Sequence, residues 1–69
     1  MHKFLIWIKD AGMTQEQVAR DLGVTQGSVS RWCSGEAIPR YEVMAKIIEM
    51  TKGFVMPNDF FATNNMGNQ

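Results

Sequence analysis

Apolar residues recur at intervals of three and four positions along most of the chain, which is the spacing of one face of an α-helix. In the first of these stretches, Phe4, Leu5, Ile8 and Ala11 share one face. The pattern predicts four helices, over Lys3 to Ala11, Thr14 to Leu22, Thr25 to Ser34 and Pro39 to Thr51. Each is followed within two residues by a glycine, which readily takes the left-handed conformation that ends a helix.

Polar residues at the predicted helix starts support the same boundaries. Thr14 and Gln17 have the spacing of a capping box, in which each side chain bonds the other residue's backbone N–H. Thr25 is suited to cap the next helix. Pro39 suits the first turn of the last one, where its missing N–H does no harm.

The C-terminal part has a weaker pattern. Phe54 to Phe61 surrounds the turn-forming triplet Pro57-Asn58-Asp59, which predicts a packed turn, either partly extended or with one helical turn after Pro57. Residues 62–69 are polar and rich in asparagine, so we expect a disordered tail there. The predicted fold is all-α, a small helical domain of four to five short helices over residues 1–61.

Length and composition exclude several classes of protein. With 69 residues the core is small, and an enzyme is not expected, because a catalytic cleft needs a larger scaffold. The longest apolar run, Phe4 to Ile8, is too short to cross a membrane. One cysteine, Cys33, and one histidine, His2, provide no zinc ligand set. We therefore expect no metal, cofactor or small-molecule ligand, and a reducing compartment in which Cys33 serves packing.

One segment has a specific pattern, which runs QEQVARDLGVTQGSVSRWCSG from Gln15 to Gly35. A small residue, Ala19, stands where two helices would cross, and Gly23 stands in the turn between them. Five apolar residues would fix the angle of the second helix: Val18, Leu22, Val24, Val29 and Trp32. This pattern resembles the helix-turn-helix of the Cro and lambda-repressor class of regulators, also called the XRE class, and small phage Cro-like proteins in particular. It implies a helix-turn-helix over 14–35, with a recognition helix over 25–34.

The resemblance implies a surface that reads double-stranded DNA. With Val29 and Trp32 facing inward, the helical period turns the other residues of the recognition helix outward. The expected base contacts are Gln26, Gly27, Ser30 and Arg31, since glutamine pairs with adenine and arginine with guanine. The expected contacts to the DNA backbone are Gln15, Thr25, Ser34 and Arg40. In this class of proteins the glutamine corresponding to Gln15 often braces the one corresponding to Gln26.

The function implied is a sequence-specific transcriptional regulator, a Cro-like repressor in the cytoplasm of a bacterium or phage-infected host. Such proteins bind pseudo-palindromic operators as dimers, so we expect a homodimer at least on DNA. Surplus apolar residues late in the chain are candidates for its interface: Met44, Ile48, Phe54, Met56, Phe60 and Phe61. Each of these residues could equally belong to the ordinary core.

The formal net charge of zero supports an alternative function, because DNA-binding domains usually carry a basic excess. The same fold could be a protein-interaction module, as in an antitoxin or an accessory regulator. Gln15, Gln26 and Arg31 oppose this alternative by standing at DNA-reading positions. Taken singly, each of the three could be a solvated surface residue.

Overall fold

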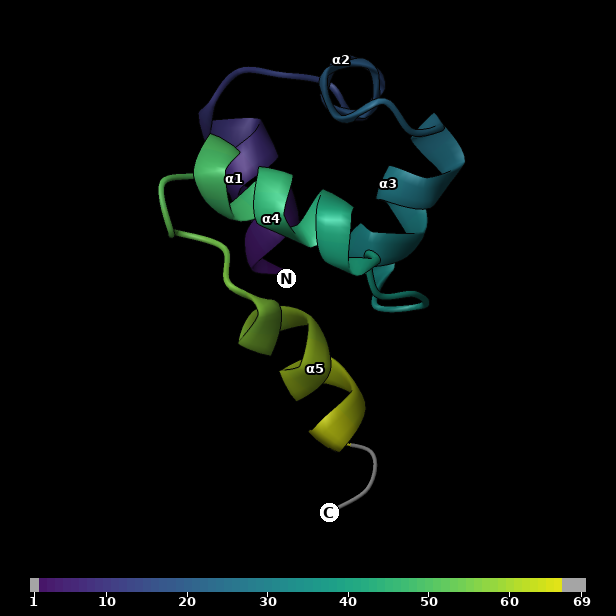
Figure 1. Cartoon of the computed structure of the whole chain (residues 1–69), viewed down its shortest axis with the longest axis vertical. Helices are drawn as coiled ribbons and strands as arrows, with labels where there is room; N and C mark the ends of the chain where they lie inside the picture. Colours follow the sequence, from purple (N-terminus) through teal and green to yellow (C-terminus); the bar gives the residue numbers. More distant parts are fainter. Residues whose placement is uncertain (1, 67–69) are drawn as a thin grey trace.

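In a computed structural model the chain forms five helices, and no strand occurs in the backbone of residues 2–66, which the structure describes together with the side chains of residues 2–61. The helices are α1 (Lys3–Asp10), α2 (Gln15–Leu22), α3 (Gln26–Ser34), α4 (Tyr41–Met50) and α5 (Pro57–Met66). Figure 1 shows α1 to α4 grouped together and α5 extending away from them. The predicted all-α fold is confirmed.

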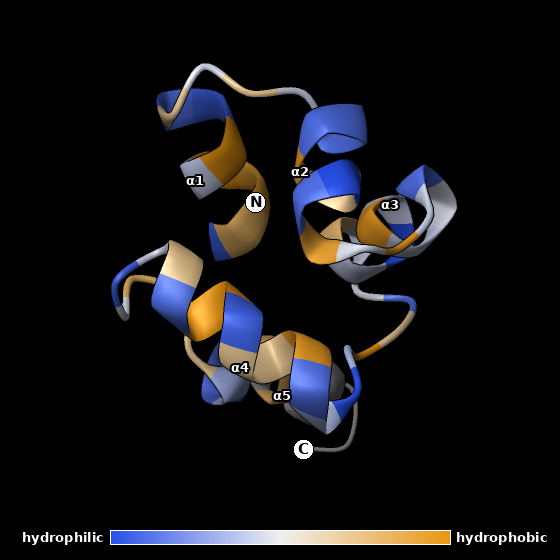
Figure 2. Cartoon of the chain, turned by 45° about the horizontal axis from the view of Figure 1, so that its top comes forward, coloured by the Kyte–Doolittle hydropathy of each residue, from blue (hydrophilic) through white to orange (hydrophobic). Residues whose placement is uncertain are grey.

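A single cluster of apolar side chains holds the helices together. Residues from α1 to α5 contribute to it, and six have essentially no exposed surface: Phe4, Ile8, Val18, Val29, Ile47 and Val55. In Figure 2 hydrophilic residues, in blue, alternate with hydrophobic ones, in orange, along α4, as expected of a helix that buries one face. Because every helix is short, the burial of these faces stabilises the fold more than helix propensity does.

The helix-turn-helix has the caps predicted from the sequence. The Thr14 hydroxyl accepts the Gln17 N–H at 3.1 Å, and Gln17 Oε1 accepts the Thr14 N–H at 2.9 Å, which completes the capping box. Gly23 is left-handed, with φ of 74°, and the next N–H, of Val24, bonds the Ala19 carbonyl at 2.9 Å. This closing pattern satisfies carbonyls that the end of α2 would otherwise leave free.

The start of α4 differs from the prediction. The helix begins at Tyr41 with Arg40 as its N-cap, so Pro39 lies outside the helix instead of in its first turn. Pro39 is buried, and it lines the same pocket as Met44. These two residues occupy the two positions of a hydrophobic staple, a contact that fixes how the chain enters a helix. Burial of the proline ring explains the later start.

The structure corrects the prediction for the C-terminal part. No extended segment forms there within the described residues, and α5 runs for ten residues, well beyond one turn. Pro57 opens α5, Asp59 accepts the Met56 N–H at 2.8 Å, and Phe60 is buried in the core. The expected disordered tail over residues 62–69 overlaps α5 as far as Met66, and residues 67–69 lie outside the described residues. That domain boundary stays a prediction.

Candidate nucleic-acid interface

The exposed face of α3 is polar, and its orientation is fixed because the opposite face of the helix is buried in the core. Val29, Trp32 and Cys33 are buried. The helix packs against α2, and Ala19, only 3% exposed, lies in the core shared by the two helices. The residues expected to read bases are all exposed: Gln26, Gly27, Ser30 and Arg31. Their outward orientation is as predicted, and Figure 1 shows α3 at one edge of the molecule.

Arg31 extends toward the start of α3. A Cβ atom built on Gly27 would lie 3.6 Å from Nη1 of Arg31 and 3.9 Å from Oγ1 of Thr25. The guanidinium, which belongs to the last turn, therefore lies beside the first turn of the same helix. In helix-turn-helix proteins the first turn of the recognition helix approaches the base edges. The open side of Gly27 leaves room for this position.

The Arg31 charge is not neutralised by an ion pair within the described part of the chain. In contrast, Arg20 lies 3.6 Å from Glu16, and Lys3 lies 3.9 Å from Asp59. Arg31 is also the only charged residue between Gln26 and Ser34. The face of α3 thus combines one available cation with neutral hydrogen-bonding groups.

Two of the expected phosphate contacts already use their hydroxyl protons inside the protein. Thr25 Oγ1 donates to Ser28 Oγ at 3.0 Å and accepts the Ser28 N–H at 3.1 Å. Ser34 Oγ donates to the Arg31 carbonyl at 3.1 Å. Both residues are exposed, but each hydroxyl would have to exchange a bond before it could donate to a phosphate.

The remaining expected phosphate contacts lie at helix starts. Gln15 is half-buried at the first position of α2, and no hydrogen bond joins it to Gln26 among the described residues. The expected brace between the two glutamines is therefore not formed here. Arg40 is exposed at the start of α4, where no side chain caps the free N–H groups. Free N–H groups at a helix start favour anions.

Sequence reasoning missed three residues. Tyr41 follows Arg40 and is 86% exposed; its position off the apolar stripe of α4 could have indicated this. Glu36 is exposed directly after α3, where a carboxylate opposes phosphate binding. His2 Nδ1 accepts the Phe4 N–H at 3.1 Å and so caps α1, a role that histidine rarely has.

Cys33 is packed, as predicted. Burial raises the pKa of its thiol to about 11, so it stays protonated and unreactive at neutral pH. The described residues include no group of three or more side chains placed to hold a metal ion. In the part of the chain that the structure covers, no helix has the length and apolar character needed to span a membrane.

Comparison with known proteins agrees with this geometry. The sequence model of the family described as helix-turn-helix matches residues 7–52, which include α2, α3 and all of α4. Searches of curated proteins and of solved structures gave no match.

Proposed function

Since the chain belongs to the helix-turn-helix family of the Cro and lambda-repressor class, a family of DNA-binding regulators and not of enzymes, we propose that it regulates transcription by reading a specific DNA sequence with α3. The observation that supports this most is the face of α3, which is exposed and polar while its opposite side is locked into the core. In this proposal Gln26 reads an adenine, Arg31 a guanine, and Ser30 a neighbouring base edge. Gly27 lets the helix backbone approach the groove.

Backbone contacts orient the protein without reading sequence. In this proposal they come from Gln15, from Arg40 with the free N–H groups of α4, and from Thr25 and Ser34 after their hydroxyls exchange partners. Arg31 is assigned to a base, so Arg40 is the cation that each protomer brings to the phosphates, and a dimer would neutralise about two phosphates. The logarithm of affinity should then fall with the logarithm of salt concentration with a slope of about −2.

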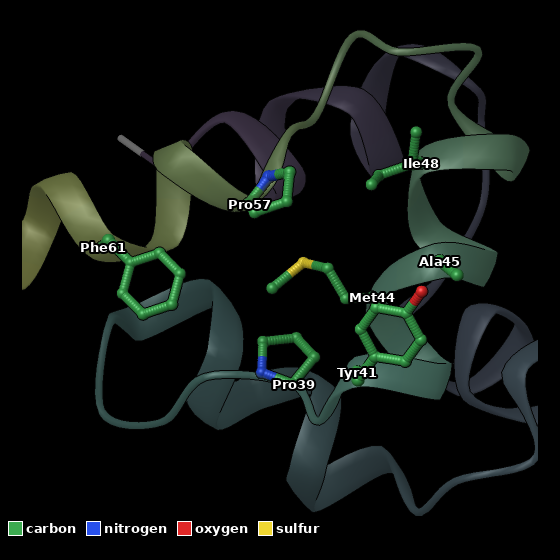
Figure 3. Close-up of a pocket in the computed structure, with 7 residues that line it drawn as sticks. All are labelled: Pro39, Tyr41, Met44, Ala45, Ile48, Pro57 and Phe61. Carbon is green, nitrogen blue, oxygen red and sulfur yellow. The ribbon is translucent and has the colours of Figure 1, made fainter.

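A homodimer on a pseudo-palindromic operator supplies the affinity that one short helix lacks. Of the residues expected at its interface, Phe60 is 2% exposed and Met44 is 7% exposed, so both belong to the core of the single chain. Phe54, Met56 and Phe61 are 43–47% exposed and remain available. Phe61 and Ile48 also line an apolar pocket of about 380 Å³ between α4 and α5 (Figure 3).

The action proposed for this surface is repression by occupying a promoter, in the cytoplasm of a bacterium or phage-infected host. A protein-interaction module is the second candidate. The neutral net charge and the exposed side chains of Phe54, Met56 and Phe61 favour it. The two candidates differ in whether the α3 face matters.

The test is selection of bound sequences from random duplex DNA, comparing the wild type with a Gln26→Ala, Arg31→Ala double variant. Lys46→Ala is the matched control, since it removes an exposed cation from α4 that the proposal assigns to neither bases nor phosphates. We expect an enriched pseudo-palindrome that the control retains and the double variant loses or relaxes. No enrichment with the wild type at any salt concentration would support the protein-interaction module instead.

A further inference from the structure

His2 lies at the junction between the first turn of α1 and the first turns of α5. Its ring centroid is 4.7 Å from that of Phe60, and Phe60 also meets Phe4 edge to face at 6.1 Å. Beside these rings, Lys3 Nζ lies 3.9 Å from the Asp59 carboxylate. Figure 1 shows the start of α1 close to the start of α5. The start of α5 is thus fastened to α1 through one imidazole, one aromatic ring and one ion pair.

The hydrogen bonding of His2 requires a neutral ring. Nδ1 accepts the Phe4 N–H, which places the proton of the neutral imidazole on Nε2. Nε2 is buried and has no hydrogen-bond partner among the described residues. A second proton would occupy Nδ1, remove the cap of α1 and bring a positive charge to a helix start, where the helix dipole disfavours it.

We propose that His2 is a protonation-sensitive latch, which holds α5 against α1 while its imidazole is neutral and loosens α5 when the imidazole takes up a proton. The neutral ring caps α1 and packs against the Phe60 ring at an interplanar angle of 41°, which keeps that side chain in the core. The charged ring no longer caps α1. Because a charged imidazole is more stable in water than against an aromatic ring, it moves away from Phe60. Pro57 and Phe61 follow, because they belong to α5, and one wall of the pocket over α4 moves with them.

The surroundings of the imidazole ring shift its pKa in opposite directions. Burial of the ring lowers the pKa of His2 below its usual 6.5, and the chain's amino group lowers it further, whereas the Asp59 carboxylate raises it. The attraction of Asp59 is shared, since this carboxylate also accepts the Met56 N–H at 2.8 Å and faces Lys3. The unfolded chain therefore binds the proton more tightly than the folded one. Stability from His2 is present above pH 6.5 and is lost as pH falls toward the lowered pKa.

The latch is tested by amide hydrogen exchange and NMR on the full chain between about pH 7.5 and about pH 5, where histidine titrates and carboxylates stay charged. We expect the protection factors of the Asp59 to Phe61 amides to fall several-fold as the pH is lowered. The protection factors of the α2 and α3 amides should stay unchanged. His2→Asn keeps a good capping oxygen but takes up no proton, so its α5 protection should not change with pH. The same fall in His2→Asn would overturn the latch.

A second measurement needs no variant. The imidazole carbon shifts of the wild type should titrate with a midpoint below 6.5, and the Phe4 and Phe60 amide signals should move with the same midpoint. A midpoint at or above 6.5, or α5 amides unchanged while the ring titrates, would contradict the proposal. No latch residue lies on α2 or α3, so the outcome is independent of DNA reading.

Discussion

Both helices of the helix-turn-helix begin at a threonine whose hydroxyl accepts a backbone N–H and end at a left-handed glycine. The C-terminal part is built differently. The N-cap of α4, Arg40, forms no side-chain capping bond, and the turn after this helix places Lys52 in the left-handed region with φ of 54°. Local side-chain chemistry sets the boundaries of α2 and α3, whereas α4 and α5 depend on what their residues bury.

The largest effect on stability is expected from truncating the buried side chain of Phe60. If burial holds α5 in place, Phe60→Ala should reduce the free energy of unfolding by about 3–5 kcal/mol, the usual cost of truncating a buried aromatic side chain. Phe61→Ala is the control from the same helix, because that ring is 47% exposed, and it should cost less than about 1 kcal/mol. Urea unfolding of both variants measures the two values. Equal, small losses would mean that α5 is not part of the core.

The same division explains how far sequence reasoning reached. The boundaries of α2 and α3 were predictable, because Thr14, Gln17 and Gly23 act on backbone groups within a few positions of themselves. The outward face of α3 was predictable for a similar reason, since the helical period alone places it once Val29 and Trp32 are assigned to the core.

Features that depend on distant residues were not predictable. The length of α5 rests on Phe60 meeting Phe4 and His2, at the opposite end of the sequence. The place of Pro39 outside α4 rests on its burial beside Met44. The hydrogen bonds of the Thr25 and Ser34 hydroxyls are local, to residues three positions away, and were missed for another reason: residue type does not show whether a hydroxyl proton is already used inside the protein.

Two glycines of the helix-turn-helix should respond in opposite ways to alanine. Gly23 has φ of 74°, where a Cβ is strained even in open space, so Gly23→Ala should destabilise the protein by about 1–2 kcal/mol. Gly27 lies inside α3 with ordinary helical φ and only ordinary contacts for a new Cβ, so Gly27→Ala should stabilise it by up to about 1 kcal/mol. Thermal and urea unfolding distinguish the two signs. A loss of stability in Gly27→Ala would show that Arg31 cannot give way.

Removing a cap from α2 and adding one to α4 compares the two regions directly. Thr14→Ala removes the hydroxyl of the capping box and should cost about 1 kcal/mol, whereas Thr14→Ser should cost little. Arg40→Ser supplies the missing acceptor at α4 and should stabilise the protein by about 0.5–1 kcal/mol. If Arg40→Ser has no effect, the free N–H groups of α4 are already well satisfied by water.

Substitutions of Lys52 test whether packing holds the turn after α4 in a backbone conformation that lysine itself disfavours. The residue closes α4 in the left-handed conformation, with its N–H bonded to the Glu49 carbonyl at 3.2 Å and the Gly53 N–H bonded to the Ile48 carbonyl at 2.9 Å. Glycine suits this position, so Lys52→Gly should raise the free energy of unfolding by about 0.5–1 kcal/mol. Lys52→Ala removes the same charge but keeps the Cβ, and should leave stability within about 0.5 kcal/mol of the wild type. An equal gain in both variants would assign the effect to the charge; a gain confined to glycine would show that tertiary burial imposes this turn on a residue that resists it.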